Sequence, residues 1–174
     1  MCSVASFNSR KVHLSHYFRV EGLIDNEILS FLFDTGASYT VVGVNNLFAA
    51  SPDNSNIDLF RTCLSEEIAI QNIEERANPL RVANKDYIQT FPCVSHNVSV
   101  EGTPRIDFYF DLSLDDISLP LLGSSYIDDC AWSNSIKGKI VVTGIADNPG
   151  AAAYAGTKVL DFDRVLQKYR DLRA

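Results

Sequence analysis

The chain has 174 residues, 46% of them hydrophobic and 21% charged, which is ordinary for a globular protein and predicts one domain, or one domain with an extension. The net charge of −7, with no basic run to offset it, argues against a nucleic-acid-binding surface, so no nucleic acid is expected as a partner. Residues 1–11 lack the apolar core of a signal peptide, and no apolar run is long enough to span a bilayer. We therefore expect a cytoplasmic protein with no membrane contact.

The four cysteines indicate reduced thiols and not a disulfide framework. They are scattered, without the spacing of a metal site: Cys2, Cys63, Cys93 and Cys130. In the absence of a secretory signal we expect three of them to be semi-buried and Cys2 to be exposed. The sequence predicts no metal and no other cofactor.

The first predicted elements form a β-hairpin. Residues 12–20 alternate partially between polar and apolar side chains, which is typical of a strand. Asp25 and Asn26 are typical of a hairpin turn, and the apolar strand Ile28–Phe33 follows them. This hairpin delivers Asp34 at the end of a buried strand.

Asp34 is the unusual residue of this segment, because a carboxylate between two apolar strands is costly to desolvate. Neighbouring residues can offset that cost. Gly36 permits a backbone turn that is closed to other residues. The hydroxyls of Thr35 and Ser38, together with nearby backbone N–H groups, can donate hydrogen bonds to the carboxylate. A turn at the end of a buried strand, without any chemistry, is the competing interpretation.

The middle of the chain predicts further strands. Residues 41–48 are typical of a strand followed by a short turn or helix, and residues 51–56 of a loop. Leu80–Val100 predicts two strands around a turn at Asn84 and Lys85, since Asn tolerates the left-handed conformation that such a turn needs.

The segment Arg105–Leu112 alternates like a strand with one buried face. Ile106, Phe108 and Phe110 share one face of this strand. The alternation assigns Asp111 to the opposite face, so we expect it to face solvent or to lie in a turn.

The C-terminal part combines strands with a helix. Leu121-Leu122-Gly123 predicts an apolar strand that ends in glycine and leads into a short helical turn, and residues 139–145 predict a further strand. Residues 147–156 are rich in small side chains and predict a mobile loop. From Asp161 onward the chain predicts a helix whose apolar stripe packs against the domain, made by Phe162, Val165, Leu166, Tyr169 and Leu172.

Two of these segments carry a resemblance to a known family. Phe31–Ser38 reads FLFDTGAS, which resembles the active-site loop of the retropepsin-like aspartic proteases, and Leu121-Leu122-Gly123 resembles the second signature of that family. The resemblance implies a mostly β protein with a closed barrel, a short helix after Gly123 and a C-terminal helix. It further implies a protease domain over residues 12–145, with residues 146–174 as a C-terminal loop and amphipathic helix extension.

The same resemblance implies roles for individual residues. Asp34 would be the catalytic carboxylate in an active-site loop made with Thr35, Gly36, Ala37 and Ser38. The glycine of the second signature would lie close under this loop, supported by the two leucines before it. The hairpin within Leu80–Val100 would be the flap that covers substrate, with its candidate residues Ala83, Asn84, Lys85, Asp86 and Tyr87. An ordinary surface hairpin is the competing interpretation of that segment.

The chain contains a single Asp-Thr-Gly sequence, although peptide hydrolysis by this route needs two carboxylates. The resemblance therefore implies a homodimer in which Asp34 of each protomer meets at the two-fold axis, with a polypeptide as substrate. Many viral members have charged residues where this chain has Ser38 and Ser124, so the dimer would need another source of stability, such as the long segment after Gly123.

Two other classes of protein remain open. The first is a catalytically inactive module of the same fold that binds peptides or dimerises. The combination of Asp34, Thr35 and Gly36 argues against it, because a non-catalytic fold need not keep a buried acid. The second is an unrelated, monomeric β-rich domain in which Asp34 is only a turn residue.

Overall fold

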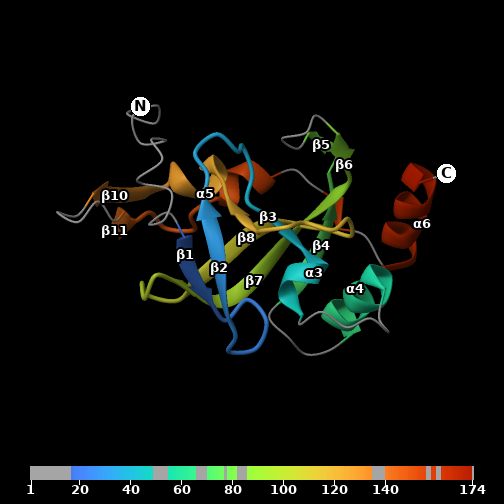
Figure 1. Ribbon diagram of the computed structural model, residues 1–174, viewed down its shortest axis with the longest axis horizontal. Helices are drawn as coiled ribbons and strands as arrows, with labels where there is room; N and C mark the ends of the chain where they lie inside the picture. The colour runs from blue at the N-terminus through green and yellow to red at the C-terminus, as the bar shows by residue number, and fades with distance from the viewer. Residues whose placement is uncertain are drawn as a thin grey trace.

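The computed structural model describes residues 17–48, 55–65, 70–76, 78–81, 86–134, 140–155, 158–159 and 162–173. Strands dominate these residues, and they form one large sheet with two small hairpins beside it (Figure 1). Of the predicted first strand, residues 12–16 lie outside the described ranges.

Six strands of the large sheet close into a barrel. In order around the barrel they are β1 (Tyr17–Glu21), β2 (Ile28–Phe33), β9 (Leu121–Leu122), β3 (Val41–Gly43), β8 (Ile106–Ser113) and β7 (Thr90–Val100). Pairing of Val20 with Val100 joins the first strand to the last. The predicted mostly β, closed-barrel fold is therefore confirmed.

The remaining elements surround this barrel. Two strands extend the sheet beyond β7, namely β4 (Ile70–Glu75) and β12 (Lys158–Val159). The two hairpins are β5 (Leu80–Arg81) with β6 (Tyr87–Ile88), and β10 (Cys130–Asn134) with β11 (Ile140–Ile145). The helices are α3 (Val44–Leu47), α4 (Asn56–Ser65), α5 (Ser124–Ile127), the 3₁₀ helix η1 (Ala151–Tyr154) and α6 (Phe162–Arg173).

The two predicted helices, α5 after Gly123 and α6 at the C-terminal end, are both present. On α6 the stripe residues Val165 and Leu166 are buried, and the helix packs against α4 (Figure 1). Helix α4 was missed by the sequence interpretation, although Phe60 and Cys63 lie one turn apart and are both buried. None of the helices in the described ranges combines the length and apolar character needed to cross a membrane.

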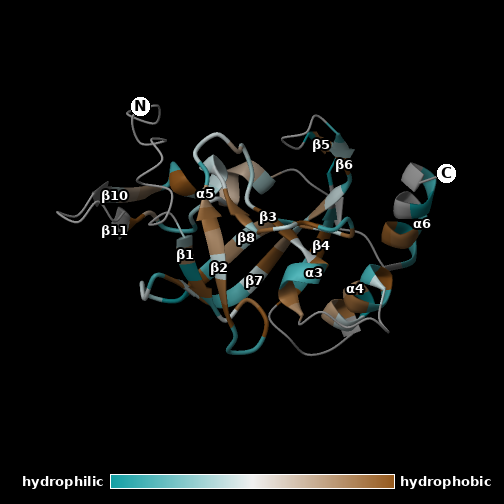
Figure 2. Cartoon of the chain, in the orientation of Figure 1, coloured by the Kyte–Doolittle hydropathy of each residue, from teal (hydrophilic) through white to brown (hydrophobic). Residues whose placement is uncertain are grey.

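Aromatic side chains fill the barrel. Phe31 of β2 meets Phe108 of β8 edge to face with ring centroids 5.9 Å apart, and Tyr126 of α5 packs on the same ring at 5.6 Å. All three side chains are 1% exposed or less. The β2 strand is accordingly hydrophobic along most of its length (Figure 2). Burial of each such side chain contributes about 1.5–3 kcal/mol, so the barrel provides a firm base for the loops at its ends.

The hairpin that leads to Asp34 forms as the sequence predicts. Strands β1 and β2 pair antiparallel, and Gly22 N–H donates to the Glu27 carbonyl at 3.1 Å to close the turn. Asp25 takes the left-handed conformation, with φ of 50°, which Asp tolerates better than most residues.

Two expectations were wrong. Asp111 does not face solvent: it is fully buried, because Arg76 and Thr90 cover its carboxylate and Tyr154 stacks on the nearby Tyr109. The segment 147–156, expected to be a mobile loop, contains a 3₁₀ helix from Ala151 whose Tyr154 side chain is buried.

The described cysteines are free thiols, as predicted. Cys63 and Cys93 are buried and not semi-buried as expected, Cys130 is partly exposed, and Cys2 lies outside the described residues. Burial raises the pKa of the Cys63 thiol to about 12. Because only the thiolate is a good nucleophile, the thiol form that burial favours is unreactive.

We therefore expect Cys63 to resist iodoacetamide at mildly alkaline pH in the native protein and to react fully after unfolding in guanidinium chloride. Mass spectrometry of tryptic peptides measures the labelled fraction at each position. Native labelling of Cys63 as fast as in the unfolded protein would contradict the buried position on α4.

Candidate active site

Asp34 stands where β2 leaves the barrel. Its backbone N–H donates to the carbonyl of Leu122 at 2.9 Å, so the neighbouring strand β9 fixes the point at which the turn begins. Phe33, directly before it, is buried, whereas the Asp34 side chain is partly exposed. The barrel therefore holds the backbone of this residue and leaves its carboxylate within reach of water.

The turn after Asp34 holds the carboxylate in one orientation. Gly36 N–H donates to Asp34 Oδ1 at 3.0 Å, and Ala37 N–H donates to the Asp34 carbonyl at 3.2 Å. Thr35 and Ala37 are partly exposed, and Gly36 and Ser38 are exposed. A carboxylate that keeps one oxygen on a backbone donor and stays accessible has the geometry for proton transfer to or from a bound water.

Gly123 lies directly under this loop. A Cβ atom at this position would come within 2.5 Å of the Tyr39 carbonyl carbon and 2.9 Å of the Ala37 oxygen. Only glycine fits so close to another backbone. The N–H groups that follow complete the contact, since Ser124 donates to the Ala37 carbonyl at 2.8 Å and Ser125 to the Ser38 carbonyl at 3.0 Å.

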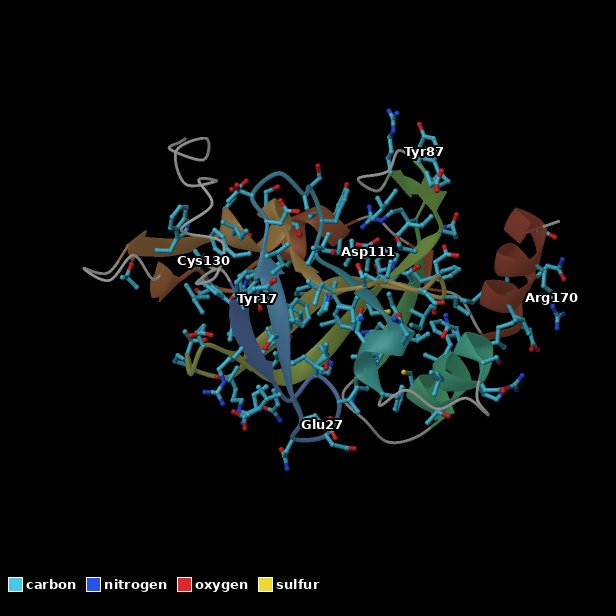
Figure 3. The ribbon with its side chains drawn as sticks, viewed as in Figure 1. Tyr17, Glu27, Tyr87, Asp111, Cys130 and Arg170 are labelled. Carbon is cyan, nitrogen blue, oxygen red and sulfur yellow. The ribbon has the colours of Figure 1, made fainter. Side chains whose placement is uncertain are left out.

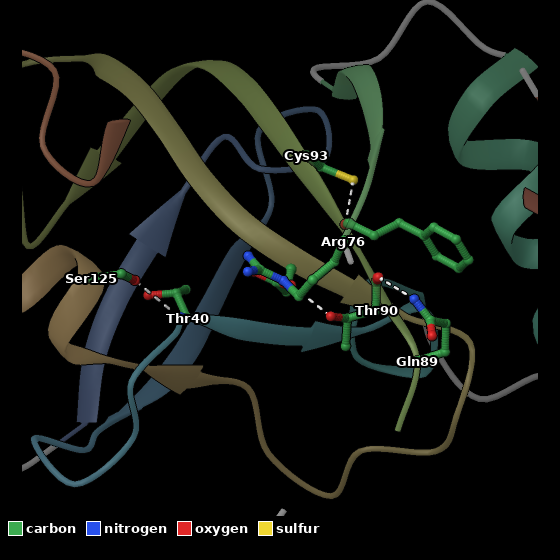
Figure 4. Close-up of polar contacts among 8 residues, drawn as sticks. Thr40, Arg76, Gln89, Thr90, Cys93 and Ser125 are labelled. Carbon is green, nitrogen blue, oxygen red and sulfur yellow. Dashed lines mark hydrogen bonds and ion pairs between the residues drawn. The ribbon is translucent and has the colours of Figure 1, made fainter. Parts of the chain in front are cut away.

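Thr40 is a residue of this site that the sequence interpretation did not single out. It is fully buried, its hydroxyl accepts a hydrogen bond from Gly123 N–H at 3.1 Å, and its own N–H donates to Ser125 Oγ at 3.2 Å (Figure 4). Thr40 therefore ties the far end of the active-site loop to the start of α5. A threonine just before an apolar strand gives little sign of such a role in the sequence alone.

Ser38 and Ser124 lie together within one chain. Ser124 Oγ donates to the Ser38 carbonyl at 3.3 Å, in addition to the bond from Ser125 N–H to that carbonyl. Neutral hydrogen bonds within this chain thus connect the segments that carry Ser38 and Ser124.

The candidate flap is a hairpin, β5 with β6, in which Arg81 pairs with Tyr87. Asp86 and Tyr87 are exposed, and Tyr87 lies at the outer end of the hairpin (Figure 3). Ala83, Asn84 and Lys85 lie outside the described residues. In Figure 1 this hairpin and the loop after β2 both project from the upper side of the barrel.

The second hairpin, β10 with β11, approaches the site from the other side of the view (Figure 1). Trp132 of β10 meets Phe33 edge to face, with ring centroids 5.3 Å apart. Because Phe33 directly precedes Asp34, this hairpin contacts the strand that carries the carboxylate. Leu121 and Leu122 of β9 pair with Leu32 and Phe33 on the same strand.

The part of the chain that the structure describes contains no candidate metal site. Nowhere in those ranges do three or more His, Cys, Asp or Glu side chains form a group that could hold a metal ion.

No family model and no curated protein sequence matches this chain. Among solved structures, the EIAV protease complexed with an inhibitor is similar over 65% of this chain and 85% of its own, with 18% identity and a TM-score of 0.42. The retropepsin-like aspartic protease from Rickettsia conorii is similar over 72% of this chain and 88% of its own, with 17% identity and a TM-score of 0.43. A likeness of this degree decides nothing about activity, which has to be argued from the site itself.

The close approach of Gly123 gives a testable prediction. We expect Gly123→Ala to lower the free energy of unfolding by about 1–3 kcal/mol, since a methyl group would force the Tyr39 backbone out of position. Urea denaturation followed by tryptophan fluorescence measures the change. Gly144→Ala is the matched control, because among the described residues its Cβ would meet only Ala131 Cβ, at an ordinary 3.6 Å. Equal stability of the two variants would contradict the tight contact.

Proposed function

We propose that this chain is an aspartic endopeptidase that works as a homodimer, with one Asp34 from each protomer at the shared site. The observation that carries the proposal is the geometry of Asp34. It combines a carboxylate accessible to water, a backbone donor at 3.0 Å on Oδ1 and a rigid support under the turn. A residue that only caps a strand would not need the support that Gly123 and Thr40 provide.

In the proposed mechanism the two carboxylates share one proton and one water. Two like charges so close cannot both ionise readily, so the pair titrates as a unit. The ionised carboxylate accepts a proton from the water as that water attacks the peptide carbonyl carbon. The protonated carboxyl donates its proton to the carbonyl oxygen. Return of a proton to the peptide nitrogen then releases the two fragments.

The other residues of the proposed site would hold the substrate and the two loops. Gly36 and Ala37 stand beside Asp34 with no large side chain, which leaves space for an extended peptide. The β5–β6 hairpin, with Asp86 and Tyr87 exposed on it, would cover the peptide and exclude water, binding its backbone in the manner of an added strand. Thr35 would contact its counterpart across the axis.

Cleavage of a denatured protein mixture tests the proposal directly. Wild type and Asp34→Asn are compared from acid to neutral pH and at several protein concentrations. We expect cleavage by the wild type alone, rising faster than linearly with concentration, because an amide keeps the shape of Asp34 but cannot act as a base. Circular dichroism checks that Asp34→Asn keeps the fold. Equal cleavage by both proteins would refute the role of Asp34.

A mixing experiment separates a shared site from a site within one chain. A tenfold excess of Asp34→Asn should lower wild-type cleavage by about tenfold if subunits exchange at random, because most wild-type chains would then sit in dimers with one carboxylate. Unchanged cleavage would contradict the shared site. Absence of cleavage by wild type under every condition would favour the inactive peptide-binding module.

A further inference from the structure

Arg76 and Asp111 form an ion pair inside the protein, beside the candidate active site. Arg76 Nε lies 2.5 Å from Asp111 Oδ2, and Nη2 lies 2.8 Å from Oδ1. The arrangement is bidentate, with both oxygens of the carboxylate on the flat guanidinium. The side chains are 10% and 0% exposed. Such a pair is sensitive to geometry, and lysine cannot reproduce it.

The surroundings of the pair stabilise the cationic form of Arg76 and hold the Asp111 carboxylate in place. Thr90 donates its hydroxyl to Asp111 Oδ2 at 2.5 Å. Burial acts to lower the pKa of Arg76, but the hydrogen bond and the charge of Asp111 outweigh it and raise that pKa. The Arg76 guanidinium therefore remains a cation beside the Asp111 carboxylate.

One connection runs from the ion pair to the active-site loop through Asp111. The Asp111 N–H donates to the Thr40 carbonyl at 2.8 Å, and the Thr40 hydroxyl accepts from Gly123 N–H at 3.1 Å. Thr40 closes the loop that begins at Asp34. The position of Asp111 thus bears on both the end of this loop and the glycine beneath it.

A second connection joins Arg76 directly to Tyr39. The Arg76 guanidinium carbon lies 4.0 Å from the centre of the Tyr39 ring and 5.4 Å from that of Tyr154. Tyr39 belongs to the active-site loop, and Tyr154 belongs to η1. A guanidinium stacked on an aromatic face is attracted by the ring and limits its movement.

Arg76 also stands at a junction of the chain. It directly follows β4, which ends at Glu75, and the hairpin β5–β6 begins at Leu80. Arg76 therefore contacts the loop through Tyr39 and also lies at the start of the segment that leads to the candidate flap.

We infer that Arg76 is a positioning residue, which holds the Tyr39–Thr40 end of the active-site loop in register with the base of the β5–β6 hairpin. This inference rests on the proposed function and deepens it. On this inference the buried ion pair does more than stabilise the barrel. It aligns the loop that carries Asp34 with the candidate flap.

The kinetic test compares Arg76→Lys with wild type on a peptide substrate. A lysine keeps the positive charge but cannot make the bidentate contact with Asp111. We therefore expect kcat to fall by about tenfold to a hundredfold, with a smaller change in KM, because small misplacement of catalytic groups has effects of this size. Arg105→Lys is the matched control: Arg105 is an exposed arginine, paired with Glu21 at 3.4 Å, and should keep wild-type kcat. A kcat for Arg76→Lys equal to that of the control would overturn the inference.

Hydrogen exchange provides a readout that does not depend on protease activity. In the Asp34→Asn background, Arg76→Lys should speed exchange at the amides of Ala37, Thr40 and Ser124 while the barrel amides of β7 stay protected. Faster exchange everywhere by the same factor would mean a purely structural role and would overturn the inference. If wild type cleaves nothing, the proposed function fails, and the exchange pattern still decides whether Arg76 positions the loop.

A second variant keeps the test valid if Arg76→Lys does not fold. Tyr39→Leu removes the stacking contact and leaves the Arg76–Asp111 pair intact, so no buried charge loses its partner. We expect the same local rise in exchange at Ala37 and Thr40, and a fall in kcat that Tyr39→Phe restores. Absence of both effects would overturn the direct connection.

Discussion

The site depends on one contact between two backbones, that of Gly123 with the loop after Asp34. A loop of this kind has few side chains to hold it, so its shape has to come from hydrogen bonds to a neighbour that approaches closely. Glycine allows this approach, and the amides of Ser124 and Ser125 use it to reach the carbonyls of Ala37 and Ser38. The barrel brings the two segments together by setting β9 between β2 and β3.

The protein handles its two prominent aspartates in opposite ways. Asp111 is fully buried, and its oxygens accept from the Arg76 guanidinium and the Thr90 hydroxyl. Loss of the Arg76 charge would leave the buried carboxylate uncompensated and cost about 3–5 kcal/mol. Asp34 is partly exposed and keeps a single backbone donor on Oδ1. The first arrangement builds structure, and the second leaves the Asp34 carboxylate accessible to water.

The sequence predicted what depends on local pattern. The hairpin to Asp34, the strand before Gly123 and the terminal helix follow from turn residues and periodicity, which neighbours in the chain determine. The Arg76–Asp111 pair was missed because its partners lie 35 residues apart in the chain, and because β8 has an apolar alternation that assigns Asp111 to solvent. Groups from other segments, Arg76 and Thr90 on its carboxylate and Tyr154 beside it on Tyr109, reverse that assignment.

The insertion of β9 between β2 and β3 has a consequence for the order of folding. During synthesis β2, Asp34 and β3 leave the ribosome long before β9, so the early chain carries the Asp-Thr-Gly sequence over an open gap in the sheet. Contacts between such distant segments form late, since a long loop has to close first. In a nascent chain the loop after Asp34 therefore lacks its support until β9 and Gly123 have emerged, so the Asp-Thr-Gly sequence is made well before the structure that holds it.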